Sequence, residues 1–79
     1  MNANNLIKMA NQIGDFFEAM PDPEQAAKDV AVHMLRFWEP RMRSGLLDYI
    51  DTSGDEVLKP IVREALPMIR DENVAAEDS

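Results

Sequence analysis

The sequence predicts an all-α fold, a small bundle or orthogonal array of about four short helices. Apolar residues recur at helical steps of three and four in four separate segments, and proline or turn residues separate those segments. No segment shows the apolar–polar alternation of a strand. A chain of 79 residues forms one domain at most, which we expect over residues 1–70, followed by a disordered acidic tail over residues 71–79.

The first two helices are expected from Asn4 to Met20 and from Pro23 to about Trp38. The apolar stripe of the first consists of Leu6, Ala10, Ile13, Phe17 and Met20, and that of the second of Ala26, Ala27, Val30, Met34 and Phe37. Between them Asp22 is a good N-cap, and Pro23 suits the first position of a helix. Gly14, inside the first helix, costs about 1 kcal/mol relative to alanine or permits close approach of another backbone.

The third and fourth helices are expected from Pro40 to about Asp51 and from Pro60 to about Arg70. Glu39 precedes a proline and therefore avoids helical dihedrals, so a break or kink separates the second and third helices. Residues 51–55 have the composition of a turn. An interior proline removes a helical hydrogen bond, so we expect Pro67 to end the fourth helix near Leu66, with one further turn after it.

Composition excludes several classes of site and partner. The chain has no cysteine and one histidine, which rules out disulfides, thiolate metal sites and sites with two imidazoles. Its net charge of −7 opposes binding to nucleic acid, and it also has the simpler explanation of solubility. No apolar run approaches the ~20 residues that span a membrane. Because polar residues interrupt the N-terminal stretch, we expect no signal peptide and a cytoplasmic location.

Catalytic, metal and carrier functions are not supported by the remaining motifs. His33 is the only base for neutral pH, and we favour a structural role for it, so no enzyme activity is expected. Asp51, Ser53 and Asp55 resemble the first half of a calcium loop, but Glu56 and Val62 stand where glycine and a bidentate carboxylate are required. An acyl-carrier-like protein is a distant alternative, since Ser44, Ser53 and Ser79 lack the Asp-Ser-Leu context for phosphopantetheine.

The segment from Arg36 to Arg43 is the main candidate for binding a partner protein. It combines three arginines with Phe37, Trp38 and Met42, and tryptophan, arginine and methionine are enriched in interfaces. The alternative is that both aromatic residues fill the core. Adjacent helical residues point about 100° apart, so we expect Phe37 in the core and Trp38 turned outward with Arg41 and Arg43. Phe16 and Phe17 form the second candidate pair.

Four stretches of sequence suggest a family. They are Leu6-Ile7-Lys8-Met9-Ala10-Asn11-Gln12-Ile13, then Phe16-Phe17, then Phe37-Trp38-Glu39-Pro40-Arg41-Met42-Arg43, and then Leu58-Lys59-Pro60-Ile61-Val62. These stretches, called here the resemblance segments, resemble the delta subunit of the soluble, NAD-dependent, molybdenum-containing formate dehydrogenases of bacteria. The resemblance extends from residue 4 to about residue 69, and amphipathicity alone does not require these patterns.

The resemblance implies a non-catalytic accessory subunit of a cytoplasmic complex that oxidises formate to carbon dioxide. The complex carries a molybdenum bis-guanine dinucleotide cofactor, iron–sulfur clusters and FMN, and it reduces NAD, whereas the delta chain itself binds no cofactor. The expected partner is the large catalytic (alpha) subunit, with indirect association to the beta and gamma subunits, in support of holoenzyme assembly or stability. The alternative in the same complex is a transient chaperone or adaptor for cofactor insertion.

Overall fold

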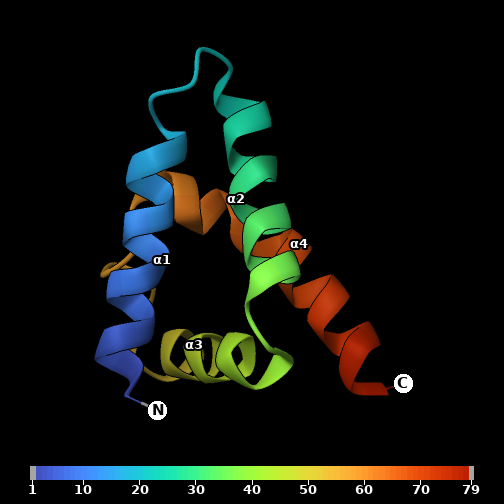
Figure 1. Ribbon diagram of the computed structural model, residues 1–79. Helices are drawn as coiled ribbons and strands as arrows, with labels where there is room; N and C mark the ends of the chain where they lie inside the picture. The colour runs from blue at the N-terminus through green and yellow to red at the C-terminus, as the bar shows by residue number, and fades with distance from the viewer. Residues whose placement is uncertain (1, 79) are drawn as a thin grey trace.

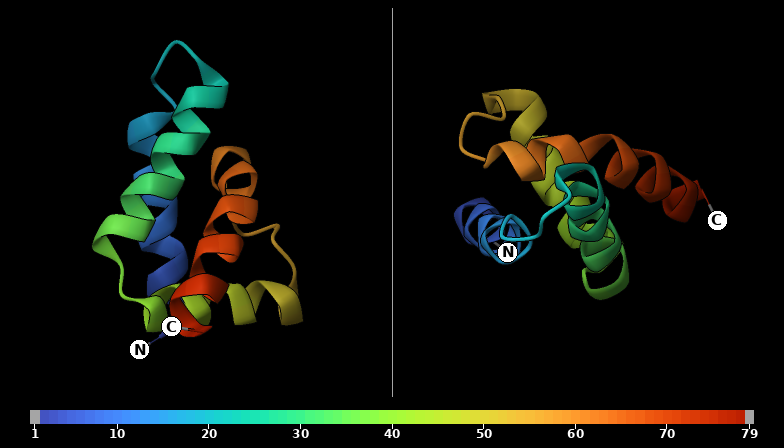
Figure 2. Two further views of the ribbon diagram at one scale, coloured as in Figure 1. Left: turned by 90° about the vertical axis from the view of Figure 1, so that its right-hand side faces the viewer. Right: turned by 90° about the horizontal axis from the view of Figure 1, so that it is seen from above.

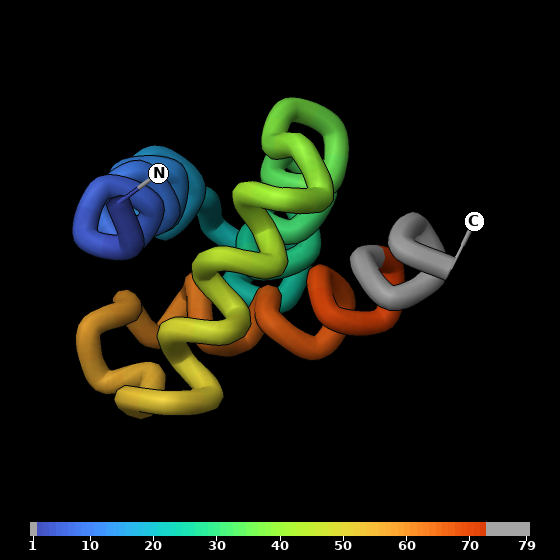
Figure 3. Tube along the Cα trace, turned by 90° about the horizontal axis from the view of Figure 1, so that it is seen from below, coloured from blue at the N-terminus to red at the C-terminus, as the bar shows by residue number. Residues whose placement is uncertain are grey.

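Four helices make up the fold, and the predicted all-α array is confirmed. The computed structural model describes the backbone of residues 2–78 and the side chains of residues 2–72. The helices are α1 (Ala3–Phe17), α2 (Pro23–Phe37), α3 (Pro40–Ser53) and α4 (Pro60–Asp78). Helices α1 and α2 lie side by side, α3 runs across their lower ends, and α4 crosses behind α2 (Figures 1 and 2). Seen from below, α3 lies across the other helices (Figure 3), so the array is orthogonal.

The turn between α1 and α2 follows from its local chemistry. The side chain of Asp22 accepts hydrogen bonds from the backbone N–H groups of Glu24 at 3.0 Å and Gln25 at 3.3 Å, and Pro23 is the first residue of α2. The predicted N-cap is therefore confirmed. Helix α1 ends at Phe17, three residues before the predicted Met20, whose N–H instead bonds the Phe17 carbonyl in a turn. Pro21 disfavours the helical conformation at Met20, which explains the earlier end.

The prediction that Pro67 ends the fourth helix is wrong. Helix α4 runs through Pro67 without interruption, and the proline ring is exposed. Leu66 and Ile69, on either side of it, are buried in the core, and that burial offsets the single hydrogen bond that proline cannot make. Asp71 and Glu72 are helical and exposed, whereas the side chains of the predicted disordered tail from residue 73 onward lie outside the described residues.

A single core joins all four helices. Its fully buried large side chains are Met34, Leu46, Ile69, Val30 and Val62, contributed by α2, α3 and α4. Leu6 and Ala10 of α1 complete the same cluster. Each helix thus buries one stripe and leaves the opposite side to solvent, as the spacing of the apolar residues requires.

Asn11 and Gly14 lie where α1 contacts the start of α4 and the loop before it. The Asn11 amide donates to the Val57 carbonyl at 2.9 Å, and its oxygen accepts from the Lys59 N–H at 2.9 Å. One turn further, α1 comes so close to α4 that a Cβ atom at Gly14 would lie 2.8 Å from Cγ2 of Val62. Two separate resemblance segments therefore meet here, at a joint of the fold.

Candidate protein interface

The structure reverses the predicted orientation of Phe37 and Trp38. Trp38 is 6% exposed and belongs to the core, whereas Phe37 is 67% exposed. The expectation that Trp38 faces outward and Phe37 inward is wrong. Trp38 follows the last residue of α2 and has an extended backbone, with φ −90° and ψ 139°. Helical geometry, with about 100° between neighbouring side chains, therefore no longer applies after Phe37, and the Trp38 side chain points into the core.

Arg43 also lies inside the fold, contrary to the outward position predicted for it. Its side chain is 4% exposed, and its Nη1 donates to the carbonyl oxygens of Leu35 at 2.8 Å and Trp38 at 3.2 Å. These carbonyls are at the C-terminal end of α2, where helical carbonyls lack partners and the helix dipole is negative. Arg43 therefore stabilises the corner between α2 and α3. Arg41 is exposed on α3, and its predicted part in binding stays a prediction.

A row of aromatic side chains runs over the surface of α1 and α2. Phe16 and Phe17 meet edge to face at 5.0 Å between ring centroids, Phe17 lies 6.0 Å from His33, and His33 lies 4.8 Å from Phe37. We call these four residues the aromatic row. Phe17 and His33 are half-buried at its centre, whereas Phe16 is 70% exposed at one end and Phe37 is exposed at the other. The described chain leaves these two end rings without cover.

Two hollows flank the contact between Phe17 and His33. The first has a volume of about 290 Å³ and is lined by Gln12, Ile13, Phe16, Phe17 and His33. The second has a volume of about 180 Å³ and is lined by Phe17, Asp29, Val32, His33, Arg36 and Phe37. The first is almost wholly apolar, and the second has one acidic and one basic residue at its edge. Both are shallow enough to receive apolar side chains of another protein, with Asp29 and Arg36 able to fix the orientation.

The aromatic row suits docking better than chemistry. His33 is its only titratable ring, and no serine or cysteine lines either hollow. Within the described residues no three histidine, aspartate or glutamate side chains come together as a metal site.

Asp51 of the discounted calcium loop faces Arg70, with Oδ1–Nη2 and Oδ2–Nη1 distances of 2.6 and 3.1 Å. This hydrogen-bonded pair lowers the pKa of Asp51 and raises that of Arg70.

Only part of the predicted interface therefore comes together on one surface. Phe16 and Phe17 lie on the aromatic row, Trp38 and Arg43 lie in the corner between α2 and α3, and Arg41 lines neither hollow. His33 was not predicted as an interface residue, and Phe37 belonged to the candidate segment but was expected in the core. Their spacing of four positions on a helix was the available signal, because such residues share a face.

The fold and this surface define a small helical domain with exposed aromatic residues. None of its described helices has the length and apolar character needed to span a membrane. The family model for the NADH-dependent formate dehydrogenase delta subunit, FdsD, matches residues 5–66, which is most of the chain. The chain belongs to this family, and the resemblance seen in the sequence is confirmed. Neither the curated proteins nor the solved structures give a match.

Proposed function

We propose that the chain is a non-catalytic accessory subunit that docks its aromatic row on the large catalytic subunit of a cytoplasmic NAD-dependent formate dehydrogenase. Docking supports the assembly or stability of the holoenzyme, and the beta and gamma subunits are reached indirectly. The observation that carries the proposal is the exposure of Phe16 and Phe37, at 70% and 67%. Both lie in resemblance segments, and the described fold uses neither ring in its core.

Other residues of those segments have a visible task in the fold. Asn11 holds the loop before α4, Trp38 fills the core, and Arg43 caps α2. Phe16 and Phe37 are the most exposed large apolar side chains of these segments. Burial of one such ring stabilises a complex by up to about 3 kcal/mol before the costs of association. The exposed aromatic row is therefore suited to contribute to binding a partner, since aromatic residues are enriched in interfaces.

The cofactors that the family implies do not fit the donor groups of this chain. Iron–sulfur clusters require thiolates, and the chain has no cysteine. A dinucleotide site of this kind requires a glycine-rich turn between strand and helix, and the described residues contain no strand. The proposal therefore assigns the molybdenum cofactor, the clusters, FMN and NAD to the other subunits. This chain contributes protein contacts alone.

The test is a double variant, Phe16→Ser with Phe37→Ser, expressed with the other subunits. Serine has a helix propensity similar to that of phenylalanine, so the helical content should hold while co-purification falls at least about tenfold. The matched control is Met20→Ser with Val57→Ser, which removes two partly exposed apolar side chains outside the aromatic row. Trp38→Ala is the folding control, because truncating a buried tryptophan costs about 3–5 kcal/mol and lowers the helical content itself.

Three outcomes separate the possibilities. Normal co-purification and formate oxidation with the double variant would contradict the proposed surface. Full cofactor content and activity in a complex made without the chain would contradict the accessory role. A chain required for assembly but absent from the purified mature enzyme would identify a transient chaperone instead of a subunit.

A further inference from the structure

The stripe of α2 that carries His33 and Phe37 of the aromatic row also carries one acidic and one basic side chain. Asp29 and Arg36 line the same hollow as these rings, together with the exposed Val32. Residues 29 and 36 are seven positions apart, so they lie about 10.5 Å apart along the helix and within about 20° of each other around it. A straight line on the surface of α2 therefore joins a carboxylate at one end to a guanidinium group at the other.

Neither charge is balanced by an ion pair within the described chain. The cations that form ion pairs there are Lys59 and Arg70, and their acidic partners do not include Asp29. The Asp29 carboxylate accepts a hydrogen bond, through Oδ1, from the side-chain amide of Gln25 at 3.0 Å. Asp29 and Arg36 are too far apart on the helix to pair with each other, because helical neighbours that interact are three or four positions apart. Both charged groups can therefore pair with groups of another molecule.

A second copy of the same stripe, packed antiparallel, satisfies both charges at once. In a two-fold symmetric contact the same surface is used on both copies, so a residue that contacts a second residue is contacted by it in return. With the symmetry axis between Val32 and His33, Asp29 of each copy faces Arg36 of the other. The contact then contains two equivalent ion pairs, and complementary charges of this kind fix the register of the two helices.

The apolar part of the face is self-complementary as well. Helices α1 and α2 lie side by side (Figure 1), and the contact between Phe17 and His33 brings the neighbouring Phe16 to the level of the axis. Phe16 is exposed and lies at the edge of the almost wholly apolar hollow of about 290 Å³. A ring that projects beside such a hollow can enter the same hollow of a second copy, while its own hollow receives the second ring.

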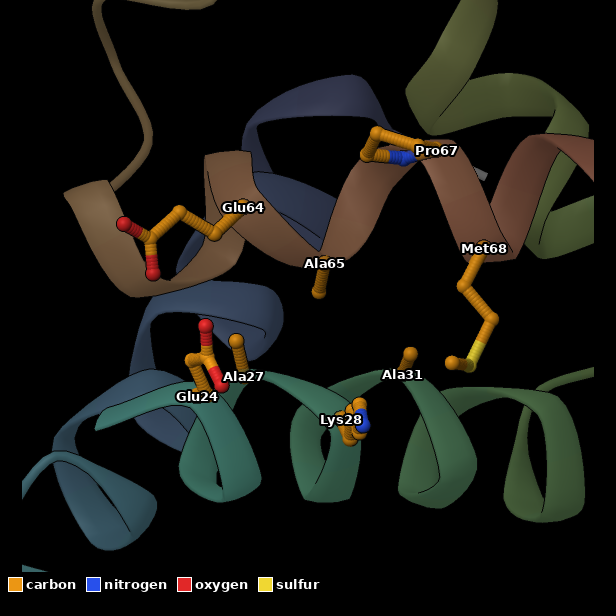
Figure 4. A pocket seen from close by; sticks show the side chains of 8 residues that line it. All are labelled: Glu24, Ala27, Lys28, Ala31, Glu64, Ala65, Pro67 and Met68. Carbon is orange, nitrogen blue, oxygen red and sulfur yellow. The ribbon is translucent and has the colours of Figure 1, made fainter. Parts of the chain in front are cut away.

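The groove between α2 and α4 lacks this complementarity. Figure 4 shows its lining, which contains two acidic residues, Glu24 and Glu64, but one basic residue, Lys28, and no aromatic ring. The alanine side chains at its base are already buried in the core. The groove shares no residue with either hollow of the aromatic row. It therefore offers control positions for changes made on the row.

We propose that the free chain forms a two-fold symmetric dimer through its aromatic row, with Asp29 of each copy paired with Arg36 of the other. The net charge of −7 opposes association in general, but the hollows of this face are lined by one acidic and one basic residue besides His33. The dimer itself does not depend on the proposed function. Its role rests on that function, because a catalytic subunit docked on the same row takes the place of the second copy, so the dimer is the form of the chain before assembly.

Analytical ultracentrifugation of the full chain over a range of concentrations measures the dimer, and two charge reversals test its geometry. Asp29→Arg places two cations opposite each other at each contact, and Arg36→Asp places two anions there, so each variant alone should dissociate at least about tenfold more readily. An equal mixture of the two variants should dimerise again, because every cation then faces an anion. This rescue distinguishes a pair formed between two chains from damage to the fold.

The matched controls are Glu64→Arg and Lys28→Asp, which make the same changes of charge at the groove between α2 and α4 (Figure 4). Both positions are exposed and line neither hollow of the aromatic row, so both variants should dimerise like the unmodified chain. The Phe16→Ser, Phe37→Ser variant should be monomeric, because it removes the two exposed rings of the contact.

Several results would overturn the dimer. A chain that stays monomeric at every concentration has no such contact, and a dimer that both reversals leave intact uses another face. Failure of the mixture to dimerise, with both variants helical by circular dichroism, would contradict the pairing of Asp29 with Arg36, and equal losses in the controls would show a general charge effect. A monomeric chain that still co-purifies with the remaining subunits would refute the dimer alone. A dimeric chain that does not co-purify with them would refute the proposed function alone.

Discussion

Replacing Gly14 with alanine tests the close approach between α1 and α4. A Cβ atom at this position would lie 2.8 Å from Cγ2 of Val62 and 3.1 Å from Cγ2 of Ile61. Both neighbours are β-branched side chains in the core, with few rotamers available to move their methyl groups away. The substitution therefore sets a gain in helix propensity against a steric conflict at a site that cannot easily relax.

The magnitude follows from these two opposing terms. Alanine gains about 1 kcal/mol over glycine inside a helix, and overpacking a core costs about 1–3 kcal/mol. Gly45→Ala is the matched control, because it gives the same gain and its one close contact, at 3.1 Å, is Cδ1 of Leu6, the end of a longer side chain that is not β-branched. Gly14→Ala should therefore be less stable than Gly45→Ala by about 2 kcal/mol.

Thermal unfolding followed by circular dichroism measures this difference. For a domain of this size about 2 kcal/mol corresponds to roughly 8–16 °C in Tm, well above experimental error. Urea unfolding with unchanged m-values would show that the variants differ in stability and not in the surface exposed on unfolding. Equal stabilisation by the two alanines would refute the close approach of α1 to Val62.

Two further predictions concern polar contacts that join distant parts of the chain. Asn11→Leu should lower the free energy of unfolding by about 1–3 kcal/mol in urea denaturation, because the Val57 carbonyl and the Lys59 N–H both lose their partner. Arg70→Gln should raise the pKa of Asp51 toward its ordinary value of 3.8, as measured by NMR titration of the carboxyl group, because the hydrogen bond from Arg70 holds that pKa down. The Asp51–Arg70 pair therefore stabilises the fold at pH values above the ordinary pKa of Asp51. This stabilisation is lost as the pH falls through the lower pKa that Asp51 has in the native state.

Each of these predictions has a result that would contradict it. Gln12 is exposed beside Asn11, so Gln12→Leu should change the free energy of unfolding by less than about 0.5 kcal/mol. An equal loss of stability in both variants would contradict the role assigned to the Asn11 hydrogen bonds. An Asp51 pKa that is the same with and without Arg70 would mean that the two side chains do not interact in solution.

The number and type of helices could be predicted because each depends on local sequence. Asp22 and Pro23 mark the start of α2 by capping and fixed φ, and the apolar spacing identifies the buried stripes. The continuation of α4 through Pro67 could not be predicted in the same way. It depends on the burial of Leu66 and Ile69 against the other helices, which the local propensity of proline does not contain.

The orientation of the aromatic residues at the α2–α3 corner could not be predicted from the sequence, for a related reason. Composition singled out residues 36–43, but a helical projection gives the direction of a side chain only while the helix continues. Trp38 has left α2, so its direction depends on the extended backbone before Pro40 and on the core space that it fills. Arg43 returns to the carbonyl groups at the end of α2, a contact that follows only from the angle between the two helices.

That reversal separates residues that build the fold from residues that are free to bind. Trp38 and Arg43 contribute to folding, so their substitution would impair any interface only by unfolding the domain. Phe16 and Phe37 lie mostly outside the core, so their substitution should alter binding and leave folding largely intact. The two properties can therefore be measured independently in this chain. A loss of binding without a loss of helicity is therefore expected at Phe16 and Phe37, and not at Trp38 or Arg43.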